Sequence, residues 1–200
     1  MTDREPMEAP FQTIDLAPTM DDAALLRATR AALRRGDGPV LFRGLLDRPL
    51  DDAESFAAWL ATLDGSRSLL CLAASGKVGP RGLALALACD LAFAGPDVGA
   101  SPEWRATLGL ATLASRRLGP LDARILLLRA DDPLRCLSDL GQLVFDPSPE
   151  AAVTDALRKI GGPRAAAAMR RNLRAAAELP FAEGCSFEAW SYKLGRGEPQ

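Results

Sequence analysis

The stretch that decides the fold reads SGKVGPRGLALALACD and spans Ser75–Asp90. Its first half holds three glycines and a proline, which predicts a loop over 76–82. Its second half alternates leucine with alanine, which predicts a buried helix over 83–89. A glycine-containing loop lets the backbone approach a ligand, and the helix N-terminus behind it presents unpaired N–H groups. The stretch is therefore suited to holding a developing negative charge on a ligand.

Short apolar runs alternate with helical patterns around this stretch. Strands are expected at 11–16, 40–42 (closed by Gly44), 69–74 and 91–94, and helices at 23–35, 51–64 and 83–89. Asp21 or Asp22 is expected to cap the first helix, and Asp51 with Glu54 has capping-box spacing at the second. Beyond 106 the pattern is mainly helical, with a short strand near 143–145, a helix starting at Ser148 and a last helix over 164–179. This alternation predicts a largely parallel sheet covered by helices.

Composition narrows the functional classes. The chain has 200 residues, 48 % hydrophobic and 25 % charged, with a net charge of −2, so a general nucleic-acid binder is not expected. The longest apolar stretch, 83–94, is interrupted by Asp90, and no membrane span is expected. Residues 1–10 are acidic and lack the apolar core of a signal peptide, which favours a cytoplasmic protein.

The absence of histidine excludes Ser-His-Asp, Cys-His and His-based metal chemistry. The four cysteines lie far apart without the paired spacing of a zinc site, so no metal is expected. Acid–base chemistry must therefore use carboxylates, lysine, the single tyrosine or backbone dipoles.

The stretch Ser75–Asp90 resembles the core motif of the crotonase (enoyl-CoA hydratase/isomerase) superfamily. In that family a strand enters an Asn-Gly-Pro loop, passes a glycine triplet and starts a helix reading roughly Leu-Glu-Leu-Ala-Leu-Ala-Cys-Asp. The resemblance continues in register: 91–94 is similar to the next strand, Pro102-Glu103 to the Pro-Glu after it, and 140–144 to the Gly-Leu-Val strand. It implies a short, divergent member with a crotonase-like (ClpP/crotonase) α/β spiral of β-β-α units.

The same resemblance implies how the chain is divided. Residues 11–146 are expected to form the α/β core and 147–194 a helical C-terminal trimerisation region. Residues 1–10 and 195–200 are expected to be frayed ends. A homotrimer or hexamer follows from the family, and no cofactor is implied because the coenzyme A thioester is the substrate.

Only one of the family's two catalytic glutamates has a counterpart. The first position falls on Ala84, which cannot donate or accept a proton, and the second falls on Glu103 after a one-residue deletion. The resemblance therefore implies Glu103 as the single catalytic acid/base. Ser101-Pro102-Glu103 also has the pattern of a helix start, so a helix-terminus role for Glu103 stands beside the catalytic one.

The glycine triplet of the family is here Pro80-Arg81-Gly82. The resemblance implies that the backbone N–H groups of Arg81 and Gly82 form the oxyanion hole. The Arg81 side chain either faces solvent or contacts a carboxylate or phosphate. The family's other oxyanion donor lies in a Ser/Ala-x-Gly-x-Asp-Leu loop after the second strand. No such sequence follows Gly44, so we expect a shortened loop there.

The substrate-binding positions implied are Lys77, Gly79 and Trp104. Two of them also have a purely structural alternative: Lys77 as a solvent-exposed side chain, and Trp104 as a core or interface residue. Metal-binding residues are not expected.

Three functions stay open from the sequence. The first is an enzyme that isomerises an acyl-CoA or acyl-carrier thioester by one-base proton transfer. The second is a catalytically degenerate accessory paralogue, which binds a thioester or a partner enzyme without turnover. The third is an unrelated parallel α/β domain in which the motif is fortuitous.

Overall fold

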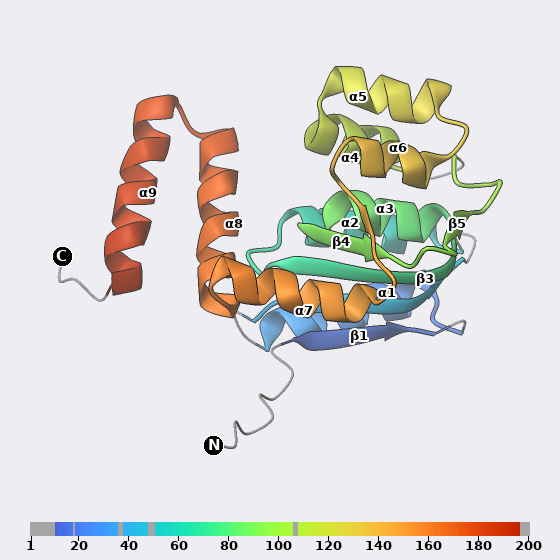
Figure 1. Ribbon diagram of the computed structural model, residues 1–200, viewed down its shortest axis with the longest axis horizontal. Coiled ribbons are helices and arrows are strands. Elements are labelled where there is room, and N and C mark those ends of the chain that lie inside the picture. The colour runs from blue at the N-terminus through green and yellow to red at the C-terminus, as the bar shows by residue number, and fades with distance from the viewer. Residues whose placement is uncertain (1–10, 18, 36–37, 48–50, 106–107, 197–200) are drawn as a thin grey trace.

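A parallel β-sheet forms the centre of the protein (Figure 1), in a computed structural model that describes residues 11–17, 19–35, 38–47, 51–105 and 108–196. The order of its strands is β1-β2-β3-β4-β6, and β5 pairs with β3. The strands are β1 (Gln12–Leu16), β2 (Val40–Leu46), β3 (Leu70–Val78), β4 (Leu91–Ala94), β5 (Gly99–Ala100) and β6 (Val144–Phe145). Every pairing between them is parallel, as the alternating pattern of the sequence predicted. The expected frayed ends are 1–10 and 195–200, of which 1–10 and 197–200 lie outside the described residues. Gly195 and Arg196 belong to the last helix instead.

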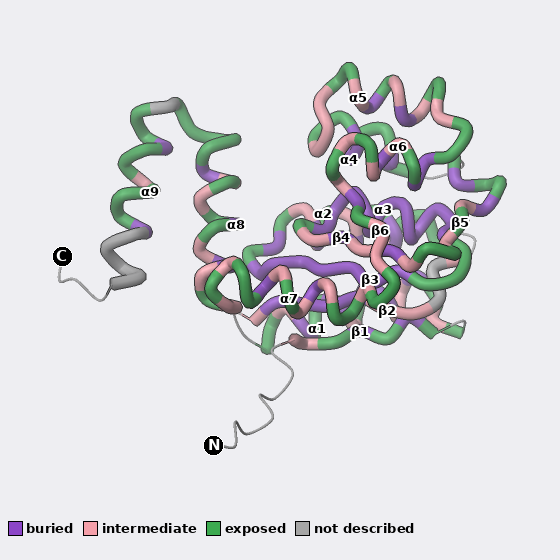
Figure 2. The backbone as a smooth tube through the Cα atoms, in the orientation of Figure 1, coloured by how far each residue is buried: buried purple, intermediate pink, exposed green. Residues whose placement is uncertain are grey.

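The two faces of the sheet are covered by different helices. Successive strand side chains point to opposite faces, so Val40 and Phe42 pack in a core with helices α1 (Asp22–Arg34), α2 (Ala53–Asp64) and α3 (Pro80–Ala88). The alternate residues Leu41 and Cys71 pack on the other face against α7 (Pro149–Ile160). Burial on both faces explains why β3 reads as a continuous apolar run, and Figure 2 shows it buried along most of its length.

A third layer of helices stacks on α3, on the side away from the sheet (Figure 1). It consists of α4 (Leu110–Leu118), α5 (Pro120–Arg124), the π-helix η1 (Ile125–Arg129) and α6 (Pro133–Asp139). The last two helices, α8 (Pro163–Glu178) and α9 (Phe181–Arg196), form a hairpin that stands out from this body (Figure 1). The sequence pattern ended the last helix near 179, so α9 was not predicted as a separate element.

The first predicted helix cap is confirmed and the second differs by one position. At α1 the cap is Asp21, whose side chain accepts from the N–H of Ala24, and Asp22 is already inside the helix. At α2 the cap is Asp52, whose side chain accepts from the N–H groups of Glu54 and Ser55. The predicted capping role of Asp51 is therefore wrong, and this frees Asp51 for a different contact.

Of the residues predicted to form a loop over 76–82, only Gly79 lies outside a strand or a helix. Strand β3 continues to Val78 because its last residues pair with β5, and helix α3 begins directly at Pro80. Strand β2 likewise continues through Gly44, whose positive φ of 107° it accommodates, rather than ending there. The strand-to-helix junction at Gly79 is thus short and tightly held.

Candidate active site

The first turn of α3 presents unpaired backbone donors. Gly79 caps the helix in an extended conformation, Pro80 occupies its first turn, and no side chain of the described residues caps the helix. The N–H groups of Arg81 and Gly82 follow, at positions that have no acceptor inside a helix. The positive end of the helix dipole lies at the same place. These are the two donors expected from the sequence, and the helix geometry leaves both without an intrahelical partner.

The turn that carries Glu103 lies beside this junction. Strand β5 pairs with the end of β3, so that Val78 stands opposite Ala100, and the N–H of Ser101 donates to the carbonyl of Val78 at 2.9 Å. The chain then makes a turn, in which the N–H of Trp104 donates to Ser101, before α4 begins at Leu110. Glu103 is exposed on this turn. Its alternative role as a helix-terminus residue is wrong, because no helix starts there.

Trp104 and Arg105 fix the turn from its far side. Trp104 is 3 % exposed and belongs to the main core. The Arg105 guanidinium stacks 4.4 Å from the centre of the Trp104 ring and donates to the carbonyls of Leu127 and Ala130 at the end of η1. Arg105 was not singled out in the sequence. A cation beside an aromatic residue in a turn was the signal available.

The remaining predicted positions divide between surface and core. Lys77 is exposed on β3, whereas Gly79 is buried. Ala84, where the family has its first glutamate, is fully buried in α3 and packs in the core. No proton-transferring group stands at that position, and the surrounding core leaves it without contact with solvent.

The side chain of Arg81 does not face solvent. It is 6 % exposed, and its guanidinium contacts two carboxylates: Nη2 lies 2.5 Å from Oδ1 of Asp22 and 3.0 Å from Oδ1 of Asp51. The Nε atom also donates to Asp22 at 2.6 Å. Of the two alternatives from the sequence, the solvent-facing one is wrong. The carboxylate contact is correct, and both carboxylates belong to the protein itself.

The two aspartates also bind each other's backbone. Oδ1 of Asp51 accepts from the N–H of Asp22 at 3.0 Å, and Oδ2 of Asp22 accepts from the N–H groups of Asp51 and Asp52 at 2.9 and 3.0 Å. The starts of α1, α2 and α3 therefore meet at one cluster, which we call the Arg81 cluster (Asp22, Asp51, Arg81). Asp22 and Arg81 are buried in it, and the side chain of Asp51 is 34 % exposed. Helix N-termini favour nearby carboxylates, which helps to hold that of Asp22 in the interior.

Burial sets the protonation behaviour of this cluster. Asp22 is fully buried, and this burial raises its pKa above 3.8, with a further rise from the hydrogen bond to Asp51. The backbone N–H groups and Arg81 act in the opposite direction, and burial outweighs them. Sequence analysis missed this role of Asp22 and Asp51, because acidic residues at helix starts are usually exposed caps.

Solved structures with the same arrangement of elements are enoyl-CoA hydratase/isomerase proteins. An enoyl-CoA hydratase/isomerase from Marinobacter aquaeolei superposes with a TM-score of 0.71 at 18 % identity, over 96 % of this chain and 90 % of that one. The Geobacillus kaustophilus protein described as enoyl-CoA hydratase subunit I gives 0.69 at 21 % identity, over 96 % and 88 %. The chain has the crotonase fold. Pseudomonas aeruginosa AtuE is also similar, with a TM-score of 0.71 at 23 % identity, over 98 % and 91 %.

No family model and no curated protein matches the sequence. The crotonase fold is therefore supported by three-dimensional likeness and by the short motif around Gly79, while most of the sequence has diverged. The third possibility left open by the sequence, an unrelated α/β domain, is excluded at the level of fold.

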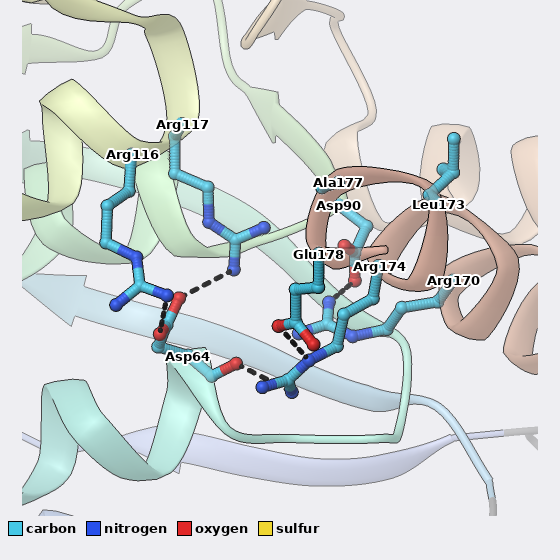
Figure 3. A pocket seen from close by; sticks show the side chains of 9 residues that line it. All are labelled: Asp64, Asp90, Arg116, Arg117, Arg170, Leu173, Arg174, Ala177 and Glu178. Carbon is cyan, nitrogen blue, oxygen red and sulfur yellow. Dashed lines mark hydrogen bonds and ion pairs between the residues drawn. The ribbon is translucent and has the colours of Figure 1, made fainter. Parts of the chain in front are cut away.

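A charged cavity of about 320 Å³ lies on another part of this crotonase fold, between α8, the end of α4 and the ends of α2 and α3 (Figure 3). Its lining residues are Asp64, Asp90, Arg116, Arg117, Arg170, Leu173, Arg174, Ala177 and Glu178. The guanidinium groups are engaged by the protein: Arg170 with Asp90, Arg174 with Glu178, and Arg116 with Asp64 at 3.3 Å. The cavity thus lies along the contact between α8 and the rest of the protein, and ion pairs between arginine and acidic side chains line it.

A second cavity of about 360 Å³ lies between α2 and α4, next to the first, and shares Asp64 and Arg116 with it. Among the described residues, neither cavity is lined by Glu103, Arg81 or Gly82. In the same part of the chain, acidic and cysteine side chains form no group of three that would hold a metal ion. No described helix combines the length and apolar character needed to cross a bilayer.

Proposed function

We propose that the chain binds an acyl thioester, of coenzyme A or of an acyl-carrier protein, at the start of α3 and moves one proton within its acyl group. One observation carries this proposal. The bond from the N–H of Ser101 to the carbonyl of Val78 brings the turn of Glu103 next to the helix start that presents the Arg81 and Gly82 donors. A bound thioester would then have the Glu103 carboxylate on one side and the N–H donors of α3 on the other.

The proposed reaction needs a single base. The Glu103 carboxylate takes a proton from C2 of a 3-enoyl thioester, and the C–H electron pair moves into the conjugated system as negative charge on the thioester oxygen. The N–H groups of Arg81 and Gly82 stabilise this dienolate. Glu103 then returns the proton to C4, which yields the 2-enoyl thioester. Hydration of the two-glutamate kind is not proposed, because Ala84 offers no second acid/base.

A second candidate is an accessory protein that binds a thioester or a partner enzyme without turnover. The burial of Ala84 in the core favours it, because that position has no catalytic group and no access to solvent. Both candidates use the same donors at the start of α3. They differ only in whether Glu103 transfers a proton.

The test is a panel of 3-enoyl-CoA substrates of different chain length, assayed with the wild type and with Glu103→Gln. Loss of general acid–base catalysis lowers turnover by about a hundredfold or more. Glu188→Gln, an exposed glutamate on α9, is the matched control and should keep full activity. Equal rates for wild type and Glu103→Gln would remove Glu103 from the mechanism. Calorimetric binding of the same thioesters without turnover supports the accessory candidate.

The assembly we propose is a homotrimer, or a hexamer of two trimers, in which the α8–α9 hairpin contacts a neighbouring subunit. Apolar side chains that a monomer leaves in solvent support it, since Leu173 is 67 % exposed on α8 and Trp190 47 % exposed on α9. Light scattering coupled to size exclusion measures the mass directly. A monomeric mass would contradict this assembly. A cytoplasmic location remains part of the same proposal.

A further inference from the structure

The Arg81 cluster lies directly behind the proposed oxyanion donors. Arg81 contributes its backbone N–H to the first turn of α3, and its side chain reaches into the layer of α1, α2 and α3. The residue therefore has two separate environments: the N–H at the helix start, and the guanidinium in the protein interior.

The charge of the guanidinium is not available to a ligand. It is 6 % exposed and is paired with the carboxylates of Asp22 and Asp51, which exceed it in formal charge. The side chain therefore adds little favourable electrostatic potential to an oxyanion. Any contribution of the side chain to oxyanion binding must therefore come from the position it gives to the backbone.

The contacts of the cluster fix three helix starts relative to one another. The Asp22 carboxylate accepts hydrogen bonds from the two N–H groups just before α2, and the Asp51 carboxylate accepts one from the N–H at the start of α1. From the start of α3, the Arg81 guanidinium donates to both carboxylates. Movement of the first turn of α3 would break charge-assisted hydrogen bonds in the interior, which is costly. The same bonds hold the backbone of Asp51 and Asp52, just before α2.

We propose that the Arg81 side chain is a positioning residue, which holds the backbone N–H groups of Arg81 and Gly82 in place for a thioester oxygen through its bonds to Asp22 and Asp51. This inference rests on the proposed thioester site. It explains how an arginine can stand where the family's motif has a glycine. The side chain points away from the donors and binds Asp22 and Asp51, so the first turn of the helix keeps its backbone N–H groups for a ligand.

The probes are acetyl-CoA and S-ethyl-CoA, a thioether that lacks the carbonyl oxygen. Preorganised donors should give the wild type about a tenfold preference for acetyl-CoA, the ratio that corresponds to one hydrogen bond of about 1.4 kcal/mol. Arg81→Met should bind S-ethyl-CoA as before and lose the preference. Arg81→Lys, which keeps the charge but offers no planar fork, should recover part of it. Arg27→Met, an exposed arginine on α1, is the matched control.

Because Arg81→Met also removes a buried ion pair, Asp51→Asn serves as a second variant that keeps the bond between Arg81 and Asp22. Circular dichroism establishes that each variant is folded before binding is measured. A folded variant of either kind that retains the tenfold preference would overturn the positioning role and leave the thioester site intact. A wild type without any preference for acetyl-CoA would instead overturn the proposed site itself, and the inference with it.

Discussion

The Nη2 atom of Arg81 lies 2.5 Å from Oδ1 of Asp22, although the two residues are 59 positions apart in the chain. Both side chains are buried. The pair therefore connects the β3–α3 junction with the start of the first helix.

The pH dependence of stability should report on Asp22. Its folded pKa is raised above 3.8, so the unfolded chain ionises first as pH rises, and the contribution of Asp22 to stability falls until the folded carboxyl ionises as well. We expect the stability of the wild type relative to Asp22→Asn to be greatest below pH 3.8 and to decrease above it. Urea denaturation of both proteins from acidic to neutral pH measures this difference. An advantage that grows with pH would contradict the raised pKa.

Arg170 should control the docking of α8. It is 7 % exposed and donates to Asp90 and to the carbonyls of Ser66 and Leu63. Arg170→Met removes the cation paired with Asp90 and one donor from each carbonyl, and it should cost about 3 kcal/mol. Hydrogen exchange should rise mainly in α8 and α9, because the hairpin loses its anchor. Arg171→Met, the exposed neighbour, should change neither quantity; equal effects of the two substitutions would remove the anchoring role.

Gly44 should tolerate no side chain. Its φ is +107°, and a Cβ built there would lie 2.8 Å from the carbonyl oxygen of Leu16 on the paired strand. We expect Gly44→Ala to lower the free energy of unfolding by about 2–3 kcal/mol. Gly99→Ala, where the added carbon meets open space, should stay within about 0.5 kcal/mol of the wild type. Thermal and urea unfolding of the pair distinguish them, and an equal loss in both would contradict the steric argument.

The cysteines should differ in reactivity. Burial raises the pKa of Cys71 to about 12 and that of Cys89 well above its usual range, so both remain thiols near neutral pH. Cys185 is exposed. Iodoacetamide should label Cys185 at least about a hundredfold faster than Cys71 or Cys89, as followed by peptide mass spectrometry. Cys185→Ser should remove the fast phase. Rapid labelling of Cys71 in the folded protein would contradict its burial.

Much of the fold follows from local sequence patterns. The apolar runs that became β3 and β4 are buried on both faces, so they are continuous and easily recognised. The end of β3 was misjudged because its extension depends on pairing with the two residues of β5, a contact that no local pattern encodes. Helix α9 was missed since its composition, with Gly184 and Ser186, is that of a loop as readily as of a helix.

The candidate site could be predicted only in part. The motif singled out Arg81, Gly82 and Glu103, and all three lie at or next to the β3–α3 junction. Their roles as donors and as base stay predictions. The partners of the Arg81 side chain could not be foreseen. Asp22 and Asp51 resemble ordinary helix caps in sequence, and only the convergence of three helix starts in space brings both to the Arg81 guanidinium.

The Arg81 cluster also constrains how this chain can change. Replacement of Arg81 by glycine, which would restore the family's motif, leaves the Asp22 carboxylate buried without its cation, at a cost of several kcal/mol. Neutralising Asp22 first removes the partner that keeps the arginine in the interior. Each substitution is therefore harmful alone and tolerable only in company with the other. The effects of substitutions at positions 22 and 81 are consequently expected to depend on each other, which is epistasis between two residues 59 positions apart.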